Sequence, residues 1–140
     1  LSDMENKEKD ALEFYGRNLG LTFQIADDTL DYNSELKLFG KKIGQDFYEG
    51  KITLPIILLF QKANNQEKEL LKNIFSKNTR EENDLDNTLS LIKKYDVIKA
   101  CYKKAEHYIN LASNALSIFR DCEEKTILEN LTSFSLSRNF

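Results

Sequence analysis

The stretch LGLTFQIADDTLDY, residues 19–32, places three aspartates in an otherwise apolar helical pattern. On a helix with about 100° between successive residues, Asp31 falls between Asp27 and Asp28, and Gln24 lies in the same arc. The opposite side is apolar and carries Leu12, Tyr15, Leu19, Phe23, Ala26 and Leu30. A helix that is apolar on most sides is buried in a bundle, so we expect the acidic strip to face an internal cavity.

Carboxylates gathered in such a place repel one another and require a cation. Oxygen ligands on a rigid element suit Mg²⁺, which commonly bridges one or two carboxylates to a substrate phosphate. We therefore predict that Asp27, Asp28 and Asp31 bind Mg²⁺. The alternative is a solvated acidic face, which a chain with 23 Asp and Glu residues can present by chance. The apolar flanks of the three aspartates favour the metal site.

Composition limits the remaining possibilities. The chain has 140 residues, 41% hydrophobic and 31% charged, which is enough for one modest core and too little for two. Its net charge of -3 gives no reason to expect nucleic acid or an anionic membrane as partner. Cys101 and Cys122 lack a C-x-x-C spacing, so we expect no disulfide framework or zinc site and a cytoplasmic location. No apolar run of about 18 residues predicts a transmembrane segment.

Helical periodicity divides the chain into three parts. We expect an aspartate helix over about residues 3–32, a functional loop over about 33–52 and C-terminal helices over about 53–137. Thr53 is expected to cap the first of these later helices, and Thr79 with Glu82 to form a capping box for another. Gly16 and Gly20 indicate a close helix crossing or, alternatively, access to the acidic cavity. No strand pattern or repeat occurs, so the predicted fold is all-α.

The predicted loop is long, rich in glycine and basic. Loops of more than about 12–15 residues in a compact domain are usually functional or disordered. Lys41 and Lys51 would bring positive charge beside the aspartates, and backbone N–H groups at glycines can approach an anion closely. A metal-bound diphosphate needs both features. The alternative is that these lysines are simply solvated, which we favour for Lys42 only. For Asp46, a role as a loop cap is as good an interpretation as a role in the site.

Two blocks of sequence at a fixed distance carry a family resemblance. They read GLTFQIADDTLDY over residues 20–32 and GKKIGQDFYEGKITLP over residues 40–55. Together they resemble the second aspartate-rich region of the trans-isoprenyl (polyprenyl) diphosphate synthases. The Tyr15-Gly16-Arg17 segment and the closing pattern Leu128-x-x-Leu131-x-x-Phe134-x-x-x-Arg138 are similar to bacterial long-chain members such as octaprenyl diphosphate synthases. The resemblance covers essentially the whole chain.

The resemblance implies an all-α bundle of isoprenoid-synthase type. In it, two D-D-x-x-D helices hold Mg²⁺ on an allylic prenyl diphosphate, whose ionisation gives a carbocation that isopentenyl diphosphate attacks. The resemblance assigns no residue of this chain to proton transfer. Carried to this sequence, the metal ligands are Asp27, Asp28 and Asp31, of which Asp27 binds directly, and the diphosphate contacts are Gln24, Lys41 and Lys51.

The family's first D-D-x-x-D motif and the arginines after it do not occur in these 140 residues. We therefore expect the C-terminal half of a synthase, with a cut end at LSDMENKEKD and no activity alone. Full-length relatives are typically homodimers, and the other half could be a separate chain. A non-catalytic partner subunit of a heteromeric synthase and a purely structural helical interaction module remain as alternatives. Product length cannot be predicted from this region.

Overall fold

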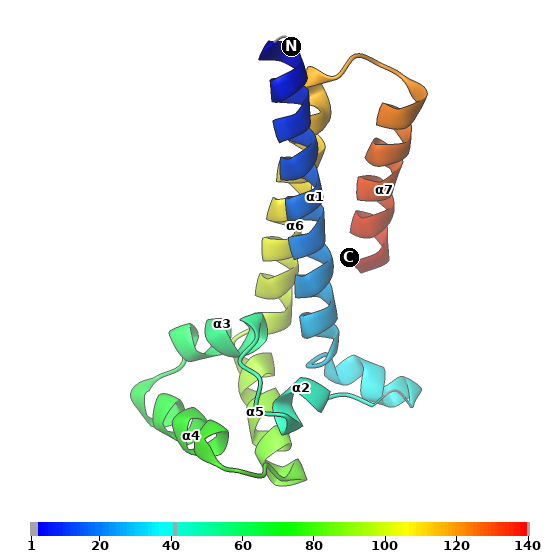
Figure 1. Ribbon diagram of the computed structural model, residues 1–140. Coiled ribbons are helices and arrows are strands. Elements are labelled where there is room, and N and C mark those ends of the chain that lie inside the picture. The colour runs from blue at the N-terminus through cyan, green and yellow to red at the C-terminus, as the bar shows by residue number, and fades with distance from the viewer. Residues whose placement is uncertain (1–2, 41, 140) are drawn as a thin grey trace. The chain divides into compact units, whose positions relative to one another are not determined.

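The computed structural model describes residues 3–40 and 42–139, and every regular element in these ranges is a helix (Figure 1). The predicted all-α fold is therefore confirmed. The chain divides into two compact units, one of residues 1–26 with 102–140 and one of residues 27–101. None of the described helices has the length and the apolar run that crossing a bilayer requires.

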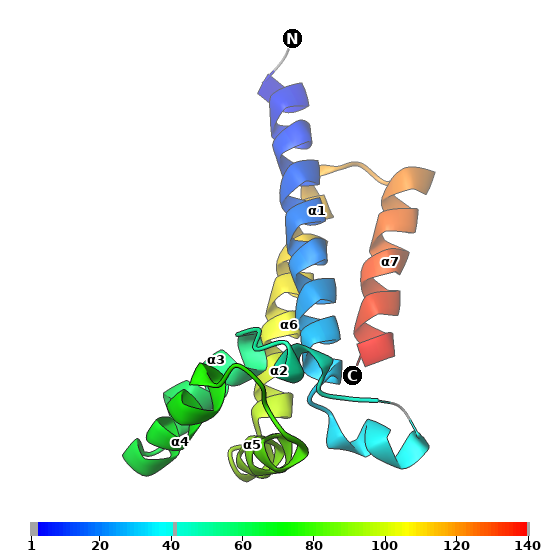
Figure 2. The same cartoon turned by 60° about the horizontal axis from the view of Figure 1, so that its bottom comes forward.

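The first unit contains three long helices and one short 3-10 helix, namely parts of α1 (Asp3–Leu30) and α6 (Val97–Ala115), then η2 (Leu116–Ile118) and α7 (Glu123–Asn139). Within this unit α1 and α6 run antiparallel, and α7 lies beside them (Figures 1 and 2). Their shared core contains Tyr15, Leu19, Ile109, Ala112 and Leu116. The Tyr15 hydroxyl donates a hydrogen bond of 2.8 Å to the Leu128 carbonyl and so ties α1 to α7. The side chains of Phe134 and Arg138 lie outside the described residues.

Helix α1 agrees with the aspartate helix predicted over residues 3–32, because its apolar residues recur at the helical period. The close helix crossing predicted at Gly16 and Gly20 is not formed within the described chain, since no neighbouring atom lies within 4 Å of a Cβ built at either position. Both glycines are exposed. Their functional alternative, access to the acidic strip, stays a prediction.

The second unit contains four α-helices of its own and a 3-10 helix, namely η1 (Ser34–Phe39), α2 (Gln45–Tyr48), α3 (Leu54–Lys62), α4 (Asn65–Ser76) and α5 (Glu82–Lys94). Helix α3 packs against α4 and α5. The most deeply buried core side chains of this unit include Phe47, Leu59, Leu71, Ile74 and Val97. The segment predicted as a loop over residues 33–52 therefore contains two short helical pieces, η1 and α2.

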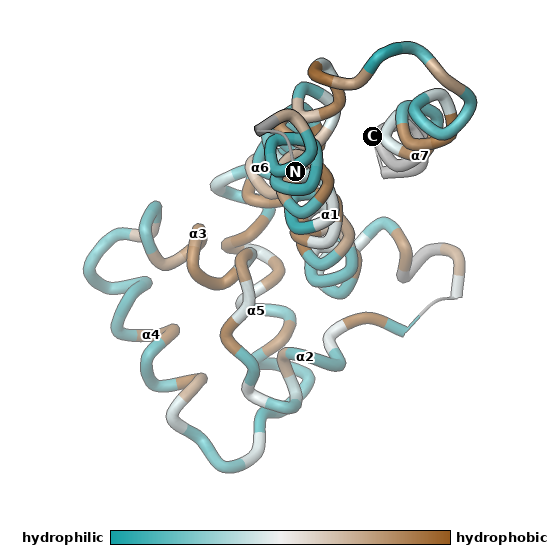
Figure 3. Tube along the Cα trace, turned by 45° about the horizontal axis from the view of Figure 1, so that its top comes forward, coloured by the Kyte–Doolittle hydropathy of each residue, from teal (hydrophilic) through white to brown (hydrophobic). Residues whose placement is uncertain are grey.

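Helix α3 is apolar along most of its length, as the brown trace in Figure 3 shows. Because Ile56 to Phe60 are apolar nearly all round, their sequence predicts a buried segment. Ile56 and Leu59 are buried, but Ile57 is 43% exposed, so this prediction is wrong at that position. The exposed side of α3 lines a cavity of about 370 Å³ with Phe60, Leu71 and Phe75.

Two predicted caps differ from the structure. Thr53 occupies the N-cap position of α3, but its hydroxyl is buried and makes no hydrogen bond to a described residue. The capping box of α5 is formed by Glu81 and Asp84, not by Thr79 and Glu82. The physical reason is that Asp84 also accepts a hydrogen bond of 2.8 Å from the Lys77 ammonium, which fixes its carboxylate beside the helix start.

Candidate functional site

The aspartate motif lies at the C-terminal end of α1, within the unit of residues 27–101. Asp27 is exposed, and Asp28 and Asp31 are half-buried. Partial burial and the neighbouring carboxylates of Asp46 and Asp27 raise the pKa of Asp28, and the Lys51 ammonium opposes this shift. Asp46 and Lys51 therefore both act electrostatically on Asp28 within this unit, and the predicted metal and diphosphate contacts stay predictions.

Asp31 has a structural partner that the sequence did not reveal. Its carboxylate accepts hydrogen bonds from the backbone N–H groups of Gly44 and Gln45, each at 3.0 Å, and from that of Asp46 at 2.7 Å. The backbone carbonyl of Asp31 also accepts from the Gly44 N–H at 2.8 Å. Asp31 thus caps the N-terminus of α2, whose own N-cap residue, Gly44, has no side chain to do so.

These bonds leave Asp31 little capacity for a metal. A carboxylate offers about four lone-pair positions, and the three N–H groups occupy all but one of them. The predicted role of Asp46 as a loop cap falls to Asp31, because the Asp46 backbone N–H is one of the groups being capped. Asp27 and Asp28 precede Asp31 by one helical turn, and no hydrogen bond of this kind engages them in the described residues.

Lys51 is placed by the C-terminal turn of α2. The Gly50 N–H bonds the Phe47 carbonyl at 3.0 Å and the Lys51 N–H bonds the Asp46 carbonyl at 2.9 Å, with Gly50 at a φ of 75°. This is a Schellman motif, for which the left-handed glycine is needed. The Lys51 ammonium lies 3.1 Å from the Glu49 carboxylate and 3.8 Å from that of Asp46. Bonding to Glu49 raises the pKa of Lys51, so its charge is secure at neutral pH.

The remaining predicted site residues are less constrained. Gln24 is an exposed residue of α1 and belongs to the unit of residues 1–26 and 102–140. Lys41 lies outside the described residues. Lys42 is exposed, as the solvated alternative predicted, and it lines a cavity of about 610 Å³ together with Tyr48 and Glu82.

No set of three His, Cys, Asp or Glu side chains among the described residues is arranged to enclose a metal ion. The donors nevertheless have the chemistry that Mg²⁺ prefers, because Asp27 and Asp28 offer carboxylate oxygens. The pKa of Asp28 is raised first by burial and then by repulsion from the neighbouring carboxylates of Asp46 and Asp27. A hard cation that is also held by phosphate oxygens would relieve this repulsion. The residues present therefore fit a metal that is shared with a ligand, and do not fit a closed protein cage.

Sequence reasoning missed two side chains beside the site. The Tyr32 ring is 1% exposed, and its hydroxyl has no hydrogen-bond partner among the described residues. Burial and the charges of Asp31 and Asp46 raise the pKa of Tyr32. Arg80 is buried and bonds the α2 backbone from a distant part of the sequence. The only available signal was an arginine in the polar segment between two predicted helices, which does not indicate burial.

The sequence is similar to those of known proteins. The profile of the polyprenyl synthetase family matches residues 1–92. The chain is 32% identical over 136 residues to the octaprenyl diphosphate synthase of Haemophilus influenzae, which covers 97% of this chain and 41% of that protein. It is 32% identical over 139 residues to heptaprenyl diphosphate synthase component 2 of Bacillus subtilis, over 99% of this chain and 39% of the relative.

The fold is shared as well. A crystal structure of a polyprenyl synthase from Caulobacter crescentus, complexed with calcium and isoprenyl diphosphate, matches with a TM-score of 0.79 at 36% identity, over 94% of this chain and 40% of that one. The chain thus spans about two fifths of the length of the relatives it matches. The helical fold of the isoprenoid synthases that the motifs predicted is confirmed, and the chain belongs to the polyprenyl synthetase family.

Proposed function

We propose that residues 1–140 form the C-terminal portion of a prenyl diphosphate synthase and supply the second aspartate-rich half of its active site. The reaction is the condensation of isopentenyl diphosphate with an allylic prenyl diphosphate, with Mg²⁺ as cofactor. The chain alone is expected to be inactive. A cytoplasmic location and a homodimeric complete enzyme belong to the same proposal.

One observation carries this proposal. The Asp31 carboxylate binds the N-terminus of α2, so the chain returns to the aspartate end of α1 after the loop. Lys51, at the other end of α2, then lies close enough to Asp28 to oppose the rise in its pKa. Carboxylates for a metal and a cation for phosphate therefore share one neighbourhood, which is what binding of a metal diphosphate requires.

The proposed mechanism gives a role to each candidate site residue. Asp27 and Asp28 would hold Mg²⁺, which would supply Lewis-acid stabilisation of the departing diphosphate. Lys51 exchanges its contact with Glu49 for a phosphate oxygen and stabilises the negative charge that develops as the allylic C–O bond breaks. The remaining predicted roles are metal contact through the last free position of Asp31 and diphosphate contacts by Gln24 and Lys41.

The test joins residues 1–140 to the part of the Haemophilus influenzae octaprenyl diphosphate synthase outside the matched region, as one fused chain and as two separate chains. Incorporation of labelled isopentenyl diphosphate is measured with Mg²⁺. We expect the fused protein to be active and Asp27→Ala to slow it by about 100-fold or more, the scale on which lost charge stabilisation acts. The matched control, Asp10→Ala at an exposed position of the same helix, should leave the rate unchanged.

Incorporation by the 140-residue chain alone, above its Asp27→Ala variant, would show that the predicted dependence on a second half is wrong. A fused protein that folds but does not respond to Asp27→Ala would refute the proposed function. Product analysis of the active fusion gives the chain length, for which an octaprenyl-like product is the finer expectation.

A second candidate is supported by one comparison, the similarity to a protein named component 2 of a heptaprenyl diphosphate synthase. A component of a heteromeric enzyme acts only with its partner chain. The separate-chain arm of the experiment distinguishes the two cases, because activity on mixing two chains, without covalent fusion, is the property of a heteromeric enzyme. A purely structural module would leave every arm inactive and its thermal stability unchanged by Mg²⁺ and pyrophosphate.

A further inference from the structure

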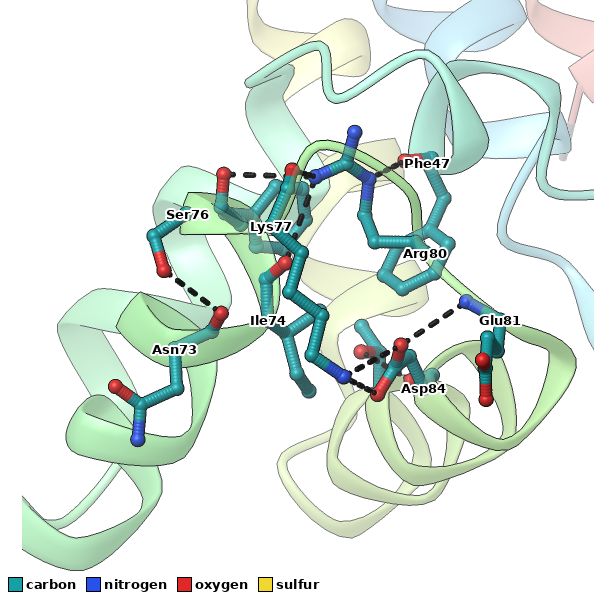
Figure 4. Close-up of polar contacts among 10 residues, drawn as sticks. Phe47, Asn73, Ile74, Ser76, Lys77, Arg80, Glu81 and Asp84 are labelled. Carbon is teal, nitrogen blue, oxygen red and sulfur yellow. Dashed lines mark hydrogen bonds and ion pairs between the residues drawn. The ribbon is translucent and has the colours of Figure 1, made fainter.

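Arg80 is a charged residue that the active-site motifs do not include, yet its side chain is only 8% exposed. Burying a charge is costly unless hydrogen bonds compensate for the lost water. Within the described residues, the hydrogen bonds of the Arg80 guanidinium run to backbone carbonyls of two elements, α2 and the end of α4, and Figure 4 draws the bond to Phe47 and those at the end of α4. The cost of burial is thus balanced by contacts whose geometry a planar, forked donor can satisfy.

The contacts at α4 anchor the guanidinium. Its Nη1 donates to the Lys77 carbonyl at 2.8 Å and, over longer distances of 3.4 and 3.5 Å, to the carbonyls of Ile74 and Phe75. These carbonyls belong to the C-terminal end of α4 and its C-cap residue, where the helix leaves backbone acceptors without the usual i→i−4 partner. A positive charge at this end also interacts favourably with the helix dipole. The bonds to α4 alone therefore fix the position of the Arg80 guanidinium.

The contacts at α2 hold the turn that precedes Lys51. Arg80 Nε donates to the Phe47 carbonyl at 2.8 Å, and Nη2 approaches the Tyr48 carbonyl at 3.4 Å. The Phe47 ring is fully buried and packs edge-to-face on Phe75 of α4, with 5.4 Å between ring centroids. Helix α2 has only one turn, so it depends on such external contacts to keep its geometry.

Gly50 brings the backbone next to the guanidinium. A Cβ built on Gly50 would lie 2.7 Å from Arg80 Nη2, closer than real contacts allow. The φ of 75° at Gly50 turns the chain so that the Lys51 N–H reaches the Asp46 carbonyl. The direction in which Lys51 leaves the turn is therefore set by the φ of Gly50 and by the Phe47 carbonyl, which accepts hydrogen bonds from both the Gly50 N–H and Arg80.

We propose that Arg80 is a positioning residue that holds the α2 turn so that Lys51 meets a diphosphate. This inference rests on the proposed function, because it takes Lys51 as a diphosphate contact. Arg80 itself does not touch the ligand. Asp31 fixes the first end of α2 and Arg80 fixes the second, so the orientation of Lys51 is determined at both ends of a single helical turn.

The experiment uses the 140-residue chain and inorganic pyrophosphate with Mg²⁺ as the probe, with affinity measured by titration calorimetry. Arg80→Met removes the guanidinium and keeps an apolar stem. Lys77→Met is the matched control, because it breaks the 2.8 Å ion pair with Asp84 in the same α4–α5 connection without touching α2. Lys51→Met removes the proposed phosphate contact, and the Lys51→Met/Arg80→Met double variant completes a cycle.

We expect Arg80→Met to weaken pyrophosphate binding about tenfold, the loss that a misplaced charged contact of moderate strength produces. Lys77→Met should bind as the unaltered chain does, even if it unfolds at a lower urea concentration. Arg80→Met should cause no further loss in the Lys51→Met background, because its effect passes through Lys51. Arg80→Lys should restore part of the affinity, since an ammonium keeps the positive charge and three donors but lacks the planar fork that the guanidinium presents to both elements.

Two outcomes would overturn the inference. One is unchanged affinity in Arg80→Met while Lys51→Met binds more weakly, and the other is an equal loss from Arg80→Met in both backgrounds, which indicates a purely structural role. Equal affinities of the unaltered chain and Lys51→Met would instead refute the proposed function. In that case amide hydrogen exchange still decides whether Arg80 orders the turn, because Arg80→Met should accelerate exchange at Lys51 and Lys77→Met should not.

Discussion

Replacing Asp31 by asparagine separates its structural bonds from any metal contact. Asparagine keeps one oxygen, which can still accept from the Gly44 and Gln45 N–H groups. Its NH₂ group would replace the oxygen that accepts the Asp46 N–H at 2.7 Å and would set a donor against a donor. One bond to a charged acceptor is lost, and two become bonds to a neutral one.

The expected size follows from these three bonds. A hydrogen bond to a charged group contributes about 1.5–3 kcal/mol and a neutral one about 1 kcal/mol. Because the Asp31 side chain is partly exposed, water reduces the contribution of its charge, and Asp31→Asn should lower the free energy of unfolding by about 2 kcal/mol. With a urea dependence of about 2 kcal/mol per molar, the midpoint of unfolding should fall by about 1 M. Circular dichroism in urea without Mg²⁺ measures this directly.

Asp28→Asn is the matched control on the same helix, and its effect should have the opposite sign. Burial and the carboxylates of Asp46 and Asp27 raise the pKa of Asp28, which means that its negative charge destabilises the folded chain at neutral pH. Removing that charge should raise the unfolding midpoint. An Asp31→Asn chain that unfolds at the same urea concentration as the unaltered chain would refute the capping role. A lowered midpoint in Asp28→Asn without metal would refute the argument from repulsion.

Three further results are expected from the same chain. In urea unfolding, Gly50→Ala should destabilise it by at least about 1–2 kcal/mol, because a residue with a side chain is strained in the left-handed conformation. Gly16→Ala should instead stabilise it by about 0.5–1 kcal/mol, because no atom lies within 4 Å of the added Cβ and alanine favours the helix. Hydrogen bonds from Lys94, Tyr95 and the Asn64 backbone lower the pKa of Glu67 to about 2, so its stabilisation should be complete above pH 4.5 and lost as the pH falls towards 2. In Glu67→Gln, the urea midpoint of unfolding should depend less on pH over this acidic range. Leu59→Ala, at a fully buried position of α3, should cost about 2–5 kcal/mol in the same assay.

The long helices could be predicted from the sequence because their signals are local. Helix α1 was expected over residues 3–32 and is observed as Asp3–Leu30, since apolar residues recur at the helical period along it. The type and spacing of the acids, with Lys51 beyond a glycine-rich segment, also predict a candidate site, whose metal and diphosphate contacts stay predictions. The helix and the spacing of its acids depend on residues within a few turns of one another.

The parts that could not be predicted depend on distant residues. Helix α2 has four residues and no period of its own, and its ends are satisfied by Asp31, which precedes it by more than ten residues, and by Arg80, 33 residues beyond Phe47. The α5 capping box shifted as well: Thr79-x-x-Glu82 fits the local rule, whereas the observed Glu81-x-x-Asp84 does not, and the bond from Lys77 fixes the Asp84 carboxylate beside the helix start. Local patterns predict where a helix can begin, and tertiary partners decide between neighbouring candidates.

The spacing of the aspartate motif has a physical explanation in this fold. Asp27 and Asp28 lie in the last full turn of α1, whereas Asp31 follows Leu30, where the helix ends and the chain turns away. A carboxylate at the helix end can reach the backbone N–H groups of a second element, and one placed a turn earlier cannot reach the same groups. The Asp31 carboxylate therefore accepts hydrogen bonds from the backbone of α2. These bonds hold α2, and with it Lys51, near Asp27 and Asp28, whose carboxylate oxygens make no such bonds within the part of the chain that the structure describes. Because the same bond that holds α2 brings Lys51 to the acids, the third aspartate can be needed for activity even where it makes no contact with the metal.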